Sequence, residues 1–356
     1  MKDLFHILKT IQTSECQKVL ATIIDVEGSS YRKEGAMMLY LEDNTEIGLL
    51  SGGCLEQDVA LKAKEVLINQ QSRIVVYDMK SVDDITWGLG IGCNGRISIL
   101  LEYIDEKLEK HLNQVNEYLN SGTPILHIKK LSHSDTVLDY VSIFSYHNHF
   151  GEWHDDDPLE IFRDVIDDKF RQGLFVKNSE RYFGQVFYPK PRLIIFGAGP
   201  DVRPLVEIAA KTGFYTIITD WRPLFCCTSY FQNANEIVHE FPNTFLKTFS
   251  FDPDDSIIIM THHFQKDQEI LQILLQKKLK YLGILGPRKR TQQLLKRNDI
   301  PKWLRSPVGL PINAEGPDEI AISILADVIK TNRKKAHQHD LWNIFSRWSK
   351  QKNELS

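Results

Sequence analysis

Long hydrophobic runs are absent from this sequence of 356 residues. No uninterrupted apolar stretch approaches the roughly 18 residues that a membrane-spanning helix needs. The first 15 residues, MKDLFHILKTIQTSE, mix acidic and basic side chains where a signal peptide has a continuous apolar stretch. We therefore expect a cytoplasmic protein with no membrane partner.

Cysteine is also scarce. The five cysteines are Cys16, Cys54, Cys93, Cys226 and Cys227. They are too few and too irregularly spaced for a disulfide framework, and no CxxC pair indicates structural zinc. This pattern is typical of a cytosolic protein whose thiols stay reduced, and it leaves the task of each thiol open.

Neither sign of charge dominates. The chain has 43 basic and 47 acidic residues, a formal net charge of -4. A protein with so small a net charge has no overall field to hold a polyanion, so we do not expect nucleic acid as its main partner. At about 150 residues per domain, the length predicts two or three domains.

The first half of the sequence mixes many strand patterns with few helix patterns. Apolar spacing predicts helices over 3–13, 55–68, 106–119 and 158–170. Strand patterns cover 19–26, 36–41, 46–50, 73–77, 96–103, 124–128 and 136–146. We expect an N-terminal α+β domain over 1–187, which can be subdivided near residue 105.

Residues 147–158 are polar and predict a loop. This segment has His147, His149 and His154 beside three aspartates. The histidines lack the fixed spacing of a metal-ligand motif, so an exposed loop is the favoured interpretation and no metal site is assigned here.

A different pattern follows the linker at 188–191. Strand patterns at 193–196, 215–219, 256–260 and 281–285 alternate with helical stretches, the first of them at 202–210. Strands that alternate with helices form parallel βαβ units. The sequence therefore predicts a Rossmann-like domain with a doubly wound parallel sheet over 188–356.

The glycine turn after the first of these strands has the layout of a dinucleotide-binding unit. Gly197 would make the tight turn, Gly199 would let the backbone approach a phosphate, and Asp220 stands where a ribose-binding acid is expected. However, Pro200 has no N–H to donate, and Asp201 would repel a pyrophosphate. A turn that binds a nucleotide or pterin phosphate and a Rossmann turn without a ligand both stay open.

Two further loops should lie at the same edge of the parallel sheet, where ligands of such sheets bind. Residues 261–267 contain His262 and His263, and residues 283–290 contain Gly286 and Arg288. A basic loop beside a glycine turn is suited to a phosphate or another anion. A solvated turn is the alternative for each loop taken alone.

A glycine-flanked cysteine marks the N-terminal half. Gly52 and Gly53 precede Cys54 at the predicted start of a helix, where unpaired N–H groups favour a thiolate that serves as a nucleophile or a soft-metal ligand. Cys93 lies in a second glycine-rich turn, and Arg32 lies in a polar loop suited to anions. A purely structural turn stays open at each of these places, because free cysteine is usually a buried apolar residue.

Seven segments, in order along the chain, resemble the xanthine dehydrogenase accessory family known as XdhC/CoxI. They are VEGSSYRKEGAMM (26–38), SGGCLEQDVA (51–60), GLGIGCNGRISILLE (88–102), IFGAGPDVRPLVEIA (195–209), TDWRP (219–223), YLGILGPRKR (281–290) and PVGLPINAEGPDEIAISILADVI (307–329). Only the middle of the chain, 105–187, has no matching segment. Seven ordered matches are far more specific than a single glycine fingerprint.

The resemblance implies a non-catalytic maturation factor. Family members bind molybdenum cofactor, protect its sulfurated form and deliver it to xanthine dehydrogenase or a related molybdenum hydroxylase, in contact with a cysteine desulfurase. The family's cysteine motif falls on Cys54, which is thereby implicated in binding the cofactor and its molybdenum. The second motif falls on Cys93, where this chain has Asn94 in place of the usual glycine. Arg32 or Arg288 would suit a pterin phosphate.

Two other functions compete with this one. An NAD(P)-dependent oxidoreductase would use Gly197, Gly199 and Asp220, with His262 or His263 as its acid. A pure scaffold would dock its partners through a C-terminal aromatic stripe in residues 340–352, made of Trp342, Phe345 and Trp348. The client enzyme, the pterin or dinucleotide form of the cofactor, and the oligomeric state, a homodimer included, are not defined by the sequence.

Overall fold

The computed structural model describes residues 2–78, 95–132, 135–145, 148–154, 157–158, 161 and 172–333. These residues fall into two compact units that separate between Pro189 and Lys190. Within this part of the chain, no helix is long and apolar enough to cross a membrane. The two units are described separately below.

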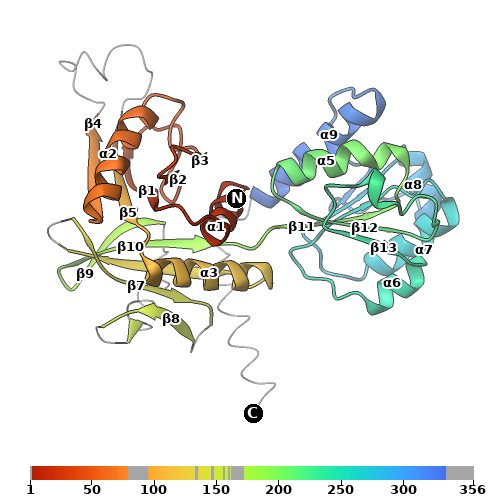
Figure 1. Ribbon diagram of the computed structural model, residues 1–356. Coiled ribbons are helices and arrows are strands. Elements are labelled where there is room, and N and C mark those ends of the chain that lie inside the picture. The colour runs from red at the N-terminus through yellow and green to blue at the C-terminus, as the bar shows by residue number, and fades with distance from the viewer. Residues whose placement is uncertain are drawn as a thin grey trace. The chain divides into compact units, whose positions relative to one another are not determined.

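The N-terminal unit contains two antiparallel sheets of five strands each (Figure 1). The first sheet has the order β3-β2-β1-β5-β4. Its strands are β1 (Lys18–Gly28), β2 (Met37–Leu41), β3 (Glu46–Gly48), β4 (Arg73–Asp78) and β5 (Gly95–Tyr103). The helices that pack on it are α1 (Lys2–Thr13), α2 (Glu56–Asn69) and α3 (Glu106–Asn120). All these elements lie where the sequence predicts them, within a few residues.

The second sheet has the order β8-β7-β6-β10-β9. Its strands are β6 (Ile125–Leu131), β7 (Val137–Ile143), β8 (His149–Glu152), β9 (Gly173–Lys177) and β10 (Glu180–Phe187). The prediction of a loop over 147–158 is wrong at β8, a short polar strand that pairs with β7 at the sheet edge. The predicted helix over 158–170 lies outside the described residues except at its first and fourth positions.

Apolar side chains bury both faces of the first sheet. One face packs against α2 through residues such as Leu50, Val59 and Ile99, and the other packs against α1 and α3. Ile24 and Leu100 of the first sheet also form a small cluster with side chains of β6 and β10. The result is one continuous N-terminal unit that holds the loops at the strand ends in place.

The C-terminal unit has a six-stranded parallel sheet in the order β13-β12-β11-β14-β15-β16. The strands are β11 (Arg192–Phe196), β12 (Tyr215–Asp220), β13 (Glu236–His239), β14 (Ser256–Ile259), β15 (Tyr281–Ile284) and β16 (Leu304–Arg305). The prediction of a doubly wound parallel sheet is confirmed, although β13 and β16 were not predicted.

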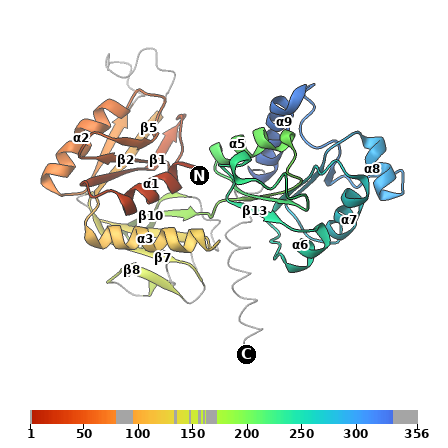
Figure 2. The ribbon, with the colours of Figure 1, turned by 45° about the vertical axis from the view of Figure 1, so that its right-hand side comes forward.

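Helices cover both faces of this sheet (Figure 2). They are α5 (Arg203–Lys211), α6 (Pro242–Thr248), α7 (Phe264–Leu274), α8 (Arg288–Leu295) and α9 (Gly316–Arg333). One cluster of buried side chains joins α5 and α9 to one face, and a second joins α6, α7 and α8 to the other. The order reverses direction at β11, so the loops after β11 and β14 lie at the switch point where ligands of such sheets bind.

Candidate functional site

Two loops of the N-terminal unit meet the start of β5 at one end of the first sheet. Gly95 pairs with Gly28, and a Cβ at Gly95 would lie 2.6 Å from the carbonyl oxygen of Glu27, so only glycine fits. The ring of Tyr31 lies 4.0 Å from the position of a Cβ on Gly52. The polar loop after β1 is therefore beside the cysteine turn, as well as beside the first residue of β5.

Ser51 and Glu56 build the turn around Cys54. The Cys54 thiol is 3.4 Å from Ser51 Oγ, which also accepts hydrogen bonds from the N–H groups of Gly53 and Leu55. The Ser51 hydroxyl donates to the carboxylate of Glu56, and that carboxylate accepts the Ser51 N–H at 2.6 Å. The start of α2 is thus capped by two side chains rather than left open, a role that was not predicted for Ser51 and Glu56.

The carboxylate of Glu56 stays ionised in this turn. Burial alone would raise its pKa, but the hydrogen bonds from Ser51 and Leu55 outweigh burial and lower the pKa. This carboxylate fixes the geometry of the turn, because it holds the Ser51 hydroxyl that the Cys54 thiol contacts. The thiol is therefore held at a defined place by neutral and acidic neighbours.

One side of the thiol is open. Cys54 is half-buried against the cluster between the first sheet and α2. Gly53 has a φ of +108°, a backbone conformation that favours glycine, and no described atom lies within 4 Å of where its Cβ would stand. A ligand can therefore approach the sulfur over bare backbone.

The other predicted N-terminal residues lie in different surroundings. The Arg32 guanidinium donates to the carboxylate of Asp3 in α1 at 3.1 Å, so this side chain already has an acidic partner. Cys93 lies outside the described residues. Among the described residues, no three histidine, cysteine or acidic side chains form a group able to hold a metal ion. His154 of the polar segment pairs instead with Asp139 at 2.6 Å.

The glycine turn of the C-terminal unit has the shape that the sequence predicts. Gly197 has a φ of +119°, and a Cβ there would lie 2.4 Å from the carbonyl oxygen of Met260, just after β14. Only glycine allows β11 to turn this close to the neighbouring strand. The turn therefore brings the loop after β14 against the loop after β11.

Asp220 anchors this turn instead of presenting a free carboxylate. One oxygen accepts the Ala198 N–H at 2.8 Å and Arg222 Nη2 at 2.7 Å, and the other accepts the N–H and Nε of Arg222, both at 2.9 Å. The Asp220 side chain is fully buried. Burial would raise its pKa, but these four donors lower it. A ribose hydroxyl would have to displace one of them, and Arg222 was not predicted as the partner.

A carboxylate also stands where the predicted phosphate would lie. Asp201 Oδ1 is 2.5 Å from the position of a Cβ on Gly199, and Asp201 Oδ2 contacts His262 Nε2 at 2.7 Å. His262 comes from the loop after β14, so the predicted convergence of the two loops is observed. Negative charge at this position disfavours a pyrophosphate.

The basic loop after β15 points in two directions. Arg290 pairs with the buried carboxylate of Asp267 at 2.6 Å, near the start of α7. Arg288 Nη1 donates instead to the carbonyl oxygen of Ser306, at the end of β16. Gly286, with a φ of +112°, makes the turn between β15 and α8. Arg288 is thus directed to the edge of the sheet and not to the glycine turn.

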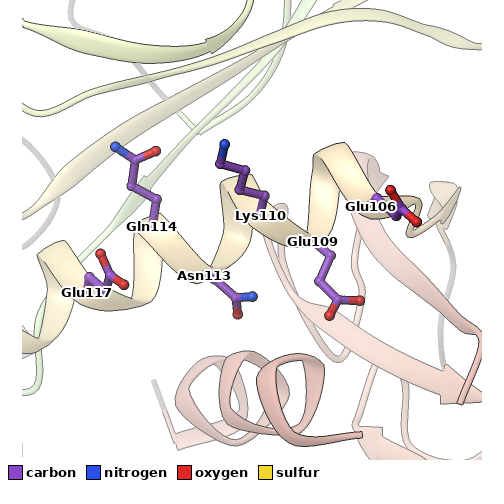
Figure 3. A pocket seen from close by; sticks show the side chains of 6 residues that line it. All are labelled: Glu106, Glu109, Lys110, Asn113, Gln114 and Glu117. Atoms are coloured by element: carbon purple, nitrogen blue, oxygen red, sulfur yellow. The ribbon is translucent and has the colours of Figure 1, made fainter. Parts of the chain in front are cut away.

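A hollow of about 600 Å³ lies along the outer face of α3 (Figure 3). Its described lining consists of polar side chains from this one helix: Glu106, Glu109, Lys110, Asn113, Gln114 and Glu117. Three carboxylates against one ammonium make this surface unsuited to a phosphate. The aromatic stripe predicted in residues 340–352 lies outside the described residues.

The architecture defines a two-unit protein in which a cysteine-bearing α+β unit precedes a Rossmann domain. Family models match three consecutive segments. They are those of the XdhC and CoxI family over residues 12–78, the BH1974-like central domain over residues 106–188, and the XdhC Rossmann domain over residues 193–328.

Whole-chain comparisons agree with these matches. A probable xanthine dehydrogenase component of Bacillus subtilis is 41% identical over 93% of this chain and 98% of its own length. The molybdenum cofactor insertion chaperone PaoD of Escherichia coli is 25% identical over 90% of this chain and 85% of its own. A crystal structure of a xanthine dehydrogenase from Bacillus halodurans has a TM-score of 0.85 and 52% identity, and covers 93% of this chain and 96% of that one. The chain belongs to the XdhC/CoxI family.

Proposed function

We propose that this protein is a maturation factor that holds molybdenum cofactor as cargo at the Cys54 turn and delivers it to a molybdenum hydroxylase. The observation that carries the proposal is the half-buried Cys54 thiol beside the open backbone of Gly53. Support also comes from the relatives, one of which is named a molybdenum cofactor insertion chaperone and another a component of xanthine dehydrogenase.

The residues of the turn fit such a cargo. Thiolate sulfur is a soft ligand of the kind that suits a metal already bound by sulfur. The exposed ring of Tyr31 beside Gly52 offers a flat surface to a pterin, and the bare glycines leave room for close approach. In this proposal Cys54 binds the molybdenum, Gly52 and Gly53 admit the cofactor, and Ser51 and Glu56 position the thiol. The bound cofactor supplies the hydroxylation chemistry only after its transfer to the client.

The finer part of the proposal concerns the form of the cargo and its partners. A thiol that is half-buried gives water and oxidants limited access to a labile terminal sulfur, which suits protection of the sulfurated cofactor. Cys93 is proposed as a second contact, because its motif continues into β5, which begins beside the loop of Tyr31. A cysteine desulfurase would supply the sulfur, and xanthine dehydrogenase is the proposed client.

In the C-terminal unit, Gly197, Gly199, Gly286 and Asp220 are proposed to shape the surface that receives the rest of the cofactor. Asp220 acts there as a positioning residue, since its four hydrogen bonds fix the glycine turn. An NAD(P)-dependent reaction is not favoured, because the acid expected on the ribose has no free acceptor position in this arrangement.

Client activation in cells tests the function. We would express a molybdenum hydroxylase client in a strain without its own factor and supply either this protein, its Cys54→Ser variant or its Cys16→Ser variant. Cys16 is also half-buried but packs in a different cluster, which makes it a matched control. We expect the Cys54→Ser variant to lose at least tenfold in client activity while Cys16→Ser keeps it. Equal activity of both variants at equal protein levels would show that the factor acts only as a scaffold.

A further inference from the structure

A second cavity lies at the edge strand of the parallel sheet. It has a volume of about 430 Å³ and is bordered by β16, the start of α8, the C-terminal half of α9 and residues 306–311. Four cationic side chains line it: Arg288, Lys302, Arg305 and Lys330. Ligand pockets commonly span about 300–1,000 Å³, so this one has room for a phosphate and part of the group that bears it.

The walls of the cavity are held by specific hydrogen bonds. Ser306 donates to Thr291 of α8 at 2.7 Å, and Ser323 of α9 donates to the carbonyl oxygen of Leu310 at 2.6 Å. Gly309 has a φ of +94°, and a Cβ there would lie 2.4 Å from the Ser323 hydroxyl, so the loop packs on α9 only with glycine at this position. The cavity is therefore a built feature of the fold and not an accident of surface side chains.

The charge of the cavity is not neutralised from within. Asp327 is the only carboxylate in its described lining, and this group is already engaged by Tyr281 Oη at 3.0 Å and by Arg305 Nε at 3.4 Å. In the described part of the chain, no carboxylate lies within ion-pair distance of Arg288, Lys302 or Lys330. Three positive charges thus face one cavity without an acidic partner, which is the setting that favours a multiply charged anion.

We propose that this cavity is a phosphate site, which takes a phosphomonoester or pyrophosphate group of a small ligand. Arg288 offers a planar guanidinium for bidentate contact with phosphate oxygens, and Lys302 and Lys330 add two ammonium groups. The glycine turn at the switch point cannot take this role as well, because Asp201 already places a carboxylate there. That the ligand is the phosphorylated cofactor rests on the proposed function, whereas phosphate binding itself does not.

Titration with two inorganic probes tests the site without any molybdenum. The full-length protein is titrated by calorimetry with inorganic phosphate and with pyrophosphate at low ionic strength, in parallel with its Arg288→Ala, Lys330→Ala and Lys289→Ala variants. Lys289 is the matched control, since it follows Arg288 in α8 but does not line the cavity. We expect Arg288→Ala and Lys330→Ala each to weaken binding at least fivefold, and Lys289→Ala to change it less than twofold.

The two probes also identify the source of the phosphate. Tighter binding of inorganic phosphate indicates a terminal phosphomonoester, and tighter binding of pyrophosphate indicates the dinucleotide form of a ligand; either result supports the site. The proposal is overturned if neither probe saturates, or if Lys289→Ala weakens binding as much as Arg288→Ala. Thermal unfolding of each variant checks that folding is intact, and failure here leaves the Cys54 experiment unaffected.

Discussion

Two buried histidines make the N-terminal unit sensitive to acid. His111 of α3 and His127 of β6 both contact the hydroxyl of Ser142, at 2.9 and 3.0 Å, and their facing ring nitrogens are 3.4 Å apart. Burial, reinforced by the positive charge of Lys129, lowers the pKa of His111 to about 3 and that of His127 well below its usual value. Both rings are therefore neutral in the folded protein near pH 7.

The direction of the pH effect follows from these lowered pKa values. Between about pH 3 and pH 6.5 the unfolded chain binds a proton at His111 that the folded chain does not, so stability falls as the pH falls through this window. At pH 5, which is 1.5 units below the reference pKa of 6.5, His111 alone costs about 2 kcal/mol relative to neutral pH, at roughly 1.36 kcal/mol per unit. His127 acts in the same direction.

Hydrogen exchange of β6 and β7 can measure this cost, because it reads the N-terminal unit separately from the Rossmann domain. We compare wild type with His111→Gln, which keeps a hydrogen-bonding side chain without a titratable ring, and with His149→Gln at an exposed position of β8. Between pH 7 and pH 5, protection corrected for intrinsic exchange should fall roughly 25-fold more in wild type than in His111→Gln. The same pH dependence in all three proteins would refute the reasoning.

Two substitutions test the packing that holds the loops. Gly197→Ala should destabilise the Rossmann unit by more than about 3 kcal/mol in thermal unfolding, because it adds a clash with Met260 to the backbone strain. Gly53→Ala, with a similar positive φ but open space around its Cβ, should stay within the roughly 1–3 kcal/mol of strain alone; equal losses would contradict the clash. Lys129→Met should cost about 3–5 kcal/mol in urea unfolding, because it leaves the buried carboxylate of Glu102 unpaired. Adding Glu102→Leu should recover most of that loss, and no recovery would show that the cost is steric.

Periodicity predicted most of the fold because most elements bury one apolar face. The helices α1 and α3 and the strands β11, β12 and β14 follow this rule closely. β8 escaped prediction because it is a polar edge strand, stabilised by its pairing with β7 rather than by a buried face. β16 has only two residues, too few for any periodicity to show.

The candidate site was only partly readable in the sequence. Motifs identified the turns at Cys54 and Gly197, because glycine and cysteine have few alternative uses at a strand end. The partners of Asp220 could not be read from the dinucleotide fingerprint, since Arg222 stands only two residues away and spacing alone does not show that it fills the carboxylate. Arg288 presents the same problem: its motif placed it beside the glycine turn, but the side chain extends to Ser306 at the sheet edge.

The Cys54 thiol, as the proposed holder of molybdenum cofactor, is tested most directly by the molar ratio of molybdenum to protein. The factor is purified from cells that make the cofactor, with Cys54→Ser and Cys16→Ser purified in parallel. We expect molybdenum in wild type and Cys16→Ser, and at least a tenfold lower ratio in Cys54→Ser with the fold intact. Equal molybdenum in all three proteins would contradict the role of Cys54.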